Sequence, residues 1–476
     1  MLLGWILLAL TAGMAFPASP QGPEHVLIIS VDGLRPDFYL REGEAAFQVP
    51  MLRQLMKNGS YARMVEGIFP SVTFPSHATI VTGVRPAKHG IPYNAVYDPT
   101  GERRGWYWFA SDIKAKTLWE AAREKGLKTA ALGWPSTVGA GIDYLISEYD
   151  WQDPEVADLI KKHSTPGLIE RVEKVAGPLT LEVARNRLKW DAFLTAAAVE
   201  VIKRYKPNLI LLHLVQTDGA QHDQGREGEK VRQAVARVDG HIGQVIQALK
   251  EARIFDPSAI IITGDHGFAD IRAQVAPNVL FRKAGLLKRT RERLEWQAFT
   301  HVTGAAAAVF VKDPKDAELT AKVEKLLLAN SVKDGERLYN VLSRAELDAL
   351  GTMPGASFGL EAEEGYSLSG AFREGTKFLR PLERTRGTHG YLPTRPSMST
   401  GFIAAGRGFK QGAVIGKIKL IDIAPTVSRL LGLRLPDIEG TAIQALLSGE
   451  TSRSWHRFGP SSFRSLAPRH HGSCPV

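Results

Sequence analysis

The amino-acid sequence predicts an α/β protein with a doubly wound, mostly parallel central sheet and helices on both faces of that sheet. Four short runs are continuously apolar instead of alternating, as expected for parallel strands that are buried on both sides. Segments with helical spacing of apolar residues lie between these runs, and such strand–helix alternation is typical of an α/β sheet. The 476 residues are 44% hydrophobic and 23% charged, which is the composition of a globular protein with a large core.

The expected elements can be placed along the chain. They are strand 26–33 (VLIISVDG), helix 117–126, strand 127–134, strand 208–219, helix 228–252, strand 258–267, strand 399–406 and helix 421–433. Residues of about 135–205 are rich in helical patterns and aromatic side chains, and residues of about 280–385 mix small-residue, charged and turn-rich segments. We therefore expect one domain over residues 25–440, with insertions at about 135–205 and 280–385.

The two ends of the chain differ from the rest in composition. Residues 2–18 are apolar without a charge, are too short to span a bilayer comfortably, and place Gly13 and Ala15 before a possible cleavage point. This pattern predicts a signal peptide over residues 1–18, and hence a periplasmic or secreted protein without a transmembrane anchor; a buried N-terminal helix is the alternative. Residues 451–476 contain few large apolar side chains, and we expect them to form a disordered tail.

Charge and cysteine content narrow the function classes. The formal net charge is +10 and the isoelectric point is about 9.5, but the basic residues are scattered and form no dense run. A solvated basic surface explains this better than a stable nucleic-acid partner. The sole cysteine, Cys474, excludes an internal disulfide and cysteine-based zinc sites in the body of the chain. None of these features indicates an oligomeric state.

Thr73 stands directly before Phe74 and Pro75, at the start of an apolar run that ends at Gly83. Proline suits the first position of a helix and glycine the position after its end. The Thr73 hydroxyl is therefore expected at or just before a helix N-terminus, where free backbone N–H groups attract an anion. In a simpler alternative, Thr73 is only an N-cap.

Several polar side chains are expected at one edge of the sheet, because the carboxyl ends of parallel strands meet there. Asp218 and His222 are one helical turn apart and can bind one ion. Carboxylate and imidazole groups without a thiolate suit zinc at a catalytic site. The candidate residues are Asp32, Asp218, His222, the adjacent pair Asp265-His266, and His389, which lies in 386–393 (RGTHGYLP) away from any strand-like run.

These residues form an ordered set that resembles the alkaline phosphatase superfamily, and within it the nucleotide pyrophosphatase/phosphodiesterase (type I phosphodiesterase) family. The resemblance runs from about Val26 to Gly440 and implies an alkaline-phosphatase-like catalytic domain. Its motifs are Asp32-Gly33, residues 73–77 (TFPSH), Thr82-Gly83, His89-Gly90, Asp218 with His222, residues 264–267 (GDHG) and residues 388–390 (THG). It implies two Zn²⁺ per chain, one held by Asp218, His222 and His389, the other by Asp32, Thr73, Asp265 and His266.

The same resemblance implies that Thr73 is the nucleophile of a zinc-dependent hydrolase and forms a covalent phospho-threonine. Zinc activation of a hydroxyl is chemically reasonable, because threonine alone is a poor nucleophile at neutral pH. Asn94 is expected to donate to a phosphate oxygen, with a turn asparagine as the alternative. Ser76, His77 and His89 are interpreted as supporting residues. His213, inside an apolar strand, is interpreted as a core residue.

The substrate is expected to be a small-molecule phosphate ester. Phe74 would form one wall of its pocket, Tyr149 or Trp151 the opposite wall, and no Lys or Arg occurs between Gly133 and Glu148. The absence of a cation there favours a phosphodiester or pyrophosphate of nucleotide type, because a monoester carries an additional charge. A phosphomonoesterase or phosphonate hydrolase with the same metals is the main alternative. A non-catalytic anion-binding protein is a remote one.

Overall fold

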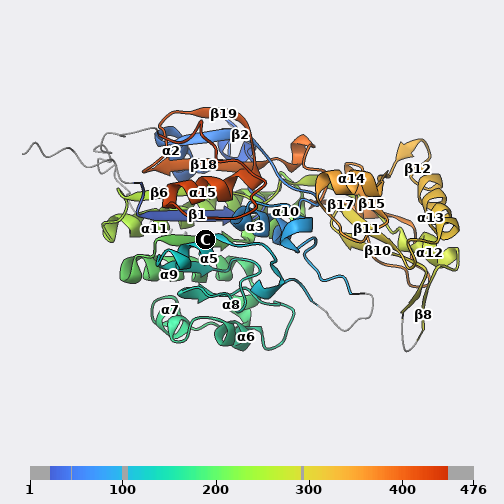
Figure 1. The fold of residues 1–476 in the computed structure, drawn as a ribbon, viewed down its shortest axis with the longest axis horizontal. Coiled ribbons are helices and arrows are strands. Elements are labelled where there is room, and N and C mark those ends of the chain that lie inside the picture. Colours follow the sequence, from blue (N-terminus) through green and yellow to red (C-terminus); the bar gives the residue numbers. More distant parts are fainter. Residues whose placement is uncertain (1–21, 44–45, 99–104, 291–293, 449–476) are drawn as a thin grey trace, which may run out of the picture.

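The computed structural model describes residues 22–43, 46–98, 105–290 and 294–448 (Figure 1). The segments interpreted above as a signal peptide and a disordered tail lie outside these residues. Within the described residues, no helix combines the length and the apolar character needed to cross a membrane.

The central sheet has eight strands, and it is mostly parallel as predicted. Its order is β19 (Val414–Lys419), β2 (Ser60–Glu66), β18 (Thr400–Gly406), β6 (Ser258–Thr263), β1 (His25–Val31), β5 (Leu209–Leu214), β3 (Thr129–Leu132) and β4 (Tyr144–Ile146). Only β18 runs antiparallel to its neighbours β2 and β6. The strand expected over residues 208–219 ends at Leu214, so its last polar residues belong to the following helix.

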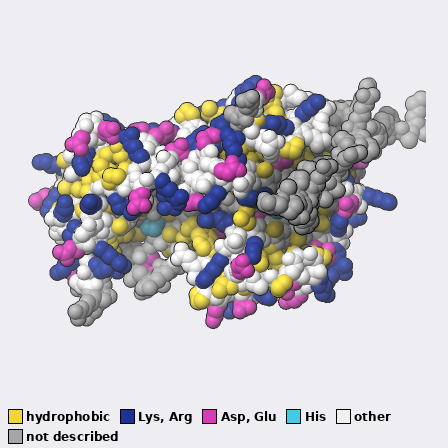
Figure 2. All heavy atoms as spheres, turned by 180° about the vertical axis from the view of Figure 1, so that it is seen from behind, with side chains coloured by type: hydrophobic (Ala, Val, Ile, Leu, Met, Phe, Trp, Pro, Cys, Tyr) yellow, Lys and Arg dark blue, Asp and Glu magenta, His cyan; other side chains and the backbone are white. Residues whose placement is uncertain are grey.

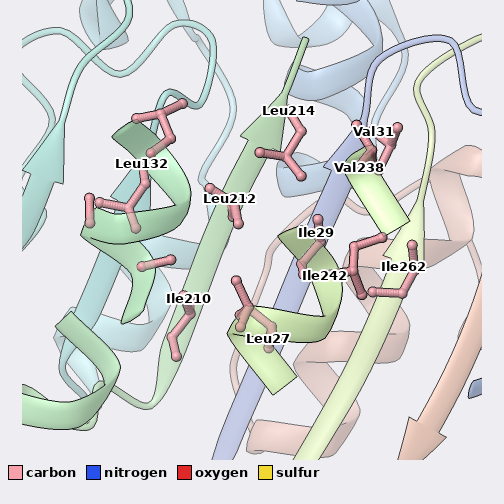
Figure 3. Packing of buried hydrophobic residues seen from close by; sticks show 14 of the residues in the cluster. Leu27, Ile29, Val31, Leu132, Ile210, Leu212, Leu214, Val238, Ile242 and Ile262 are labelled. Atoms are coloured by element: carbon pink, nitrogen blue, oxygen red, sulfur yellow. The ribbon is translucent and has the colours of Figure 1, made fainter. Parts of the chain in front are cut away.

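Both faces of the sheet are buried, which explains why the strands are continuously apolar. Leu27, Ile29 and Val31 of β1 pack on one face against Val238 and Ile242 of a long helix (Figure 3). The intervening Val26 and Ile28 point to the opposite face. The helices whose buried residues join the first face are α2 (Pro50–Asn58), α6 (Val156–His163), α7 (Leu168–Ala176), α9 (Arg187–Tyr205) and α11 (Glu229–Glu251). Those of the second face are α3 (Thr73–Thr82), α5 (Leu118–Glu124) and α15 (Ile423–Leu431).

Two segments extend beyond this core. The first, after β4, contains α6, α7 and α8 (Leu181–Arg185) and lies beside the β4 edge of the sheet (Figure 1). The second lies between β6 and β18 and forms a lobe with its own apolar cluster. Its strands are β7 (Ala269–Val275), β8 (Leu287–Arg289), β9 (Leu294–Trp296), β10 (Ala298–Thr303), β11 (Ala306–Val311), β12 (Val332–Lys333), β13 (Glu336–Arg337), β14 (Tyr339–Leu342), β15 (Phe358–Ala362), β16 (Gly365–Leu368) and β17 (Leu379–Thr388). Its helices are α12 (Asn278–Lys283), α13 (Ala317–Ala329) and α14 (Arg344–Leu350).

The remaining α-helices of the described residues are α1 (Asp37–Leu40), α4 (Pro86–His89) and α10 (Gln216–Gln224). Three 3-10 helices complete them: η1 (Ala110–Asp112), η2 (Pro396–Met398) and η3 (Leu420–Asp422). The charged side chains are distributed much as the composition suggests. Lys and Arg are spread over the face shown in Figure 2 and stand beside Asp and Glu at many points.

Candidate active site

The polar residues selected from the sequence come together beyond the carboxyl ends of β1, β5 and β6. Asp32 follows β1, Asp218 and His222 lie on α10 directly after β5, and Asp265 and His266 follow β6. His389 arrives from the second lobe, immediately after β17. The expectation that His389 lies away from any strand was wrong, since it directly follows β17. The sequence did not reveal this strand because β17 is largely exposed and charged and has no apolar pattern.

The first cluster contains Asp218, His222 and His389. His222 Nε2 lies 3.1 Å from Asp218 Oδ1, consistent with their positions one turn apart on α10. His389 Nε2 lies 3.6 Å from the same oxygen and 3.2 Å from His222 Nε2. Three potential ligand atoms therefore converge on one point.

The second cluster surrounds His266 Nε2. Asp32 Oδ1 lies 3.2 Å from this nitrogen, Asp265 Oδ2 3.3 Å and Thr73 Oγ1 3.5 Å. The two clusters adjoin, because single ligand atoms of Asp32, Asp218 and His266 all lie within 4.8 Å of one another. All the residues expected from the resemblance to hold a metal thus lie in one of two neighbouring clusters.

The tautomers of the three histidines leave Nε2 as a lone-pair atom. Nδ1 of His222 lies 3.0 Å from the Gly387 carbonyl oxygen, Nδ1 of His389 lies 2.9 Å from that of Ser71, and Nδ1 of His266 lies 3.1 Å from that of Gly267. A carbonyl oxygen only accepts, so Nδ1 carries the proton in the neutral ring. With both rings neutral, the Nε2 lone pairs of His222 and His389 would face each other across 3.2 Å, and a shared proton or a metal ion bound to both nitrogens would remove this repulsion.

The carboxylates also fit a cation. Asp32 Oδ1, Asp218 Oδ1 and Asp265 Oδ2 are buried and have no hydrogen-bonding partner within the described part of the chain. Burial and the neighbouring Asp218 raise the pKa of Asp32, and burial and Asp32 raise the pKa of Asp265. Burial lowers the pKa of His266, but Asp265 and Asp32 outweigh it and raise this pKa to about 9. The pocket therefore has an excess of negative charge, and its oxygen and imidazole donor set suits a divalent metal.

Thr73 is held at the first position of α3. The helix begins two residues earlier than the sequence suggested, so Pro75 occupies its third position and Val72 is the N-cap. The end at Gly83, in the left-handed conformation with a φ of 70°, agrees with the prediction. Thr73 makes no side-chain cap hydrogen bond in α3, so the structure gives no support to the alternative in which it is only an N-cap.

Asn94 lies beside the helix start. Its Oδ1 accepts a hydrogen bond of 2.9 Å from the Phe74 N–H, which leaves the side-chain NH₂ group as the donor toward the cavity that Asn94 lines. Since Pro75 has no N–H and the Phe74 N–H is occupied, the first turn of α3 offers few free amides. Asn94 is therefore the better placed donor for an anion beside Thr73.

Buried side chains support the two clusters from behind. His77 Nδ1–H donates to the Thr73 carbonyl oxygen at 2.8 Å, and its ring contacts Trp134. His89 Nε2 lies 3.1 Å from Thr79 Oγ1 of α3. His213 is fully buried, as expected of a core residue, but its Nε2 also lies 3.3 Å from Asp32 Oδ2. The apolar context of β5 concealed this contact in the sequence.

A cavity of about 180 Å³ opens over Thr73, Asp218, His222 and His389. Phe74, Tyr149 and Trp151 line it, in agreement with the expected aromatic walls. Trp106 was missed: it lines the cavity and its ring centroid lies 5.3 Å from Phe74 and 4.9 Å from Trp151. It comes from an irregular segment between α4 and α5, where no periodic pattern marks it.

Three charged residues of the cavity were also missed. Burial raises the pKa of Glu148, at the end of β4, to about 8. Arg185 and Arg187, at the junction of α8 and α9, line the cavity and supply positive charge. Residues 133–148 contain no Lys or Arg, as noted from the sequence, but Arg185 and Arg187 bring positive charge to the cavity from the end of the first insertion, so that segment alone does not decide between a diester and a monoester.

Comparison with known proteins places this geometry in context. The family model described as "Type I phosphodiesterase / nucleotide pyrophosphatase" matches residues 26–392. Bis(5′-adenosyl)-triphosphatase of Bos taurus is 24% identical over 446 residues, which cover 91% of this chain and 83% of that protein. Ectonucleotide pyrophosphatase/phosphodiesterase family member 1 of Homo sapiens is 28% identical over 262 residues, or 53% of this chain and 24% of that longer protein.

Solved structures agree on the fold. The inactive form of murine ectonucleotide pyrophosphatase/phosphodiesterase 5 in complex with AMP is similar to this chain with a TM-score of 0.63 and 21% identity. The match covers 90% of this chain and 100% of that one. The human protein gives a TM-score of 0.64 at 20% identity.

Proposed function

Because the chain belongs to the type I phosphodiesterase/nucleotide pyrophosphatase family, we propose that it is a zinc-dependent hydrolase that cleaves phosphodiester or pyrophosphate bonds in nucleotide-type substrates. The observation that carries this proposal is the placement of the Thr73 hydroxyl, 3.5 Å from His266 Nε2 and beside unpartnered carboxylate oxygens at the floor of the cavity. An exported protein would fit the name of its human relative, ectonucleotide pyrophosphatase/phosphodiesterase family member 1.

Two Zn²⁺ ions are assigned to the two clusters. Asp218, His222 and His389 would hold one ion, and Asp32, Asp265, His266 and the Thr73 oxygen the other. When bound, zinc lowers the pKa of a hydroxyl or water and stabilises charge on the entering and leaving oxygens. The buried carboxylate and Nε2 atoms described above support this assignment.

The side chains then account for the reaction in two displacements. Thr73 Oγ1 attacks phosphorus and forms the phospho-threonine, while the bond from phosphorus to the leaving oxygen breaks. Asn94 donates from its NH₂ group to a phosphate oxygen, a type of interaction whose loss costs on the order of 10²–10³ in rate. A water then displaces the Thr73 oxygen and releases the phosphate-bearing product. Trp106, Tyr149 and Trp151 offer aromatic faces for a base or an aryl group, and the fully buried Phe74 packs against Trp106 at the wall of the cavity.

The preferred substrate can be tested directly. We expect kcat/KM for a nitrophenyl nucleotide diester to exceed that for nitrophenyl phosphate by at least about tenfold, or ~1.4 kcal/mol of transition-state preference. Phe74→Ala should narrow this gap by weakening the diester reaction. Since Phe74 is fully buried, alanine also costs about 3–5 kcal/mol of stability. Phe74→Leu, which keeps apolar volume but removes the ring, is the better variant.

The opposite preference would indicate a different member of the superfamily. A phosphomonoesterase or phosphonate hydrolase remains the second candidate, and Arg187 in the cavity is the observation that favours it. The diester assignment is wrong if wild-type protein prefers nitrophenyl phosphate and Phe74→Leu changes neither the diester rate nor the monoester rate. A thermal unfolding curve of each variant separates a local effect of the ring from a loss of folded protein.

A further inference from the structure

Arg187 is the first residue of α9 and lines the cavity. The turn before it is fixed, because Asn186 Oδ1 accepts from the backbone N–H groups of Leu188 and Lys189. The side chain is half exposed, and its Nη2 lies 4.0 Å from Asp218 Oδ2. This separation is too long for a hydrogen bond. The donors of Arg187 are therefore free for another acceptor as far as the described residues are concerned.

The neighbouring Arg185 has a different task. Its Nε donates to the Trp151 carbonyl oxygen, and its Nη2 donates to the carbonyl oxygens of Gln152 and Asp153. These bonds hold the loop that presents Tyr149 and Trp151. Arg185 is thus a positioning residue for the aromatic wall, and only Arg187 keeps its guanidinium for a ligand.

The structure also provides space for Arg187. At Gly219, the residue after Asp218, an added Cβ would lie 2.5 Å from Arg187 Cδ and 2.9 Å from its Nη1. The guanidinium therefore lies against the backbone of α10, which keeps it close to the cluster of Asp218, His222 and His389. Any larger residue at position 219 would force the arginine to move.

The position of Arg187 relative to Thr73 indicates which part of a substrate it faces. In an in-line displacement the nucleophile and the leaving group lie on opposite sides of phosphorus. Thr73 belongs to the cluster around His266, whereas Arg187 borders Asp218 of the other cluster. Arg187 is consequently on the side of the leaving group.

We propose that Arg187 determines specificity by binding a phosphate on the leaving group, so that pyrophosphate-linked nucleotides are favoured over diesters with an uncharged leaving group. This inference rests on the proposed function and assigns a residue and a charge to its leaving-group site. Guanidinium binds phosphate through paired, charge-assisted hydrogen bonds, which a glutamine cannot replace.

The test compares two substrates that release the same product. ATP and the nitrophenyl ester of AMP both yield AMP, but only ATP has a phosphorylated leaving group. For Arg187→Gln we expect kcat/KM to fall at least about tenfold with ATP and less than about threefold with the nitrophenyl ester. The kcat/KM of Arg187→Lys with ATP should lie between those of the wild type and Arg187→Gln, because lysine keeps the charge without the paired hydrogen bonds. Zinc content is measured for each variant and should not change.

Lys189→Gln is the matched control. It removes one positive charge from the same helix, but Lys189 is exposed, pairs with Glu182 and does not line the cavity. Both substrates should be hydrolysed at wild-type rates by this variant. An equal loss with both substrates in Arg187→Gln would overturn the proposal. Nitrophenyl phosphate serves as a third substrate, and a loss confined to it would also overturn the proposal and assign Arg187 to the transferred phosphoryl group.

A binding measurement separates this proposal from the proposed hydrolase function. In zinc-loaded Thr73→Ala protein, calorimetry gives dissociation constants for AMP and ADP with and without Arg187→Gln. We expect Arg187→Gln to raise the dissociation constant for ADP by about tenfold and that for AMP by less than about twofold. If wild-type protein hydrolyses neither substrate, the proposed function fails, but the ADP comparison still decides the role of Arg187. Equal affinities for ADP in Thr73→Ala protein with and without Arg187→Gln would contradict the proposed role of Arg187.

Discussion

Replacing Thr73 by alanine is expected to reduce kcat by on the order of 10⁴-fold or more, as the loss of a covalent nucleophile does in other hydrolases. The only polar contact of the hydroxyl among the described residues is His266 Nε2 at 3.5 Å, so its removal should cost no more than about 1 kcal/mol of stability. Activity is measured with a nitrophenyl nucleotide diester, and stability by thermal unfolding. The expected result is a folded, inactive protein.

Two variants make this result specific to the nucleophile. Thr73→Ser keeps a hydroxyl at the same atom and should retain part of the activity. Ser76 was interpreted from the sequence as a supporting residue, but its buried hydroxyl has no hydrogen-bonding partner in the described chain, so Ser76→Ala should behave like wild type. Acid quenching during turnover of a phosphorus-labelled substrate should leave label on wild-type protein and none on Thr73→Ala. Wild-type turnover by Thr73→Ala would show that Thr73 is not the nucleophile.

The sequence predicts the residues near the sheet well for a physical reason. Asp32 and Asp265 lie just after the buried parallel strands β1 and β6, and Asp218 lies in the first turn of the helix that follows β5. The carboxyl ends of parallel strands lie at one edge of the sheet. Their apolar patterns are strong because both faces of the sheet are covered. Placing these side chains together therefore requires only the fold class and not the details of packing.

Residues that depend on tertiary packing were harder to place. Arg187 and Trp106 come from segments outside the sheet, and their position over the cavity depends on how these segments pack against its end. His213 belongs to the apolar strand β5, yet its Nε2 lies 3.3 Å from Asp32 Oδ2. No spacing along the chain distinguishes such a histidine from an ordinary core residue.

Removing one metal-binding side chain is expected to affect metal content and activity together. The zinc-loaded protein should contain about two zinc ions per chain, and His222→Ala about one. His222 supplies one of three ligand atoms in its cluster, and the neighbouring His266 belongs to the other cluster. Metal content is measured by atomic emission, and kcat/KM should fall at least about 10²-fold, as when a catalytic ion is lost.

The same logic predicts a different result for the buried carboxylates. Asp265→Asn keeps the shape of the side chain but removes a charge that burial and Asp32 disfavour. In metal-free protein this change should raise the melting temperature, because fewer buried carboxylates repel each other. With zinc present it should lower both the metal content and the stabilisation that zinc gives by binding the folded state. Only a cation site reverses the sign of the stability change in this way.

His241→Ala is the control for both variants. His241 lies on α11, outside the two clusters, and its loss should leave two zinc ions and wild-type activity. Full activity after exhaustive chelation would contradict the assignment of both clusters, as would wild-type metal content in His222→Ala. A metal content that falls while activity stays constant would mean that the cluster of Asp218, His222 and His389 stabilises the fold and takes no part in hydrolysis. The paired measurement therefore separates a structural ion from a catalytic one.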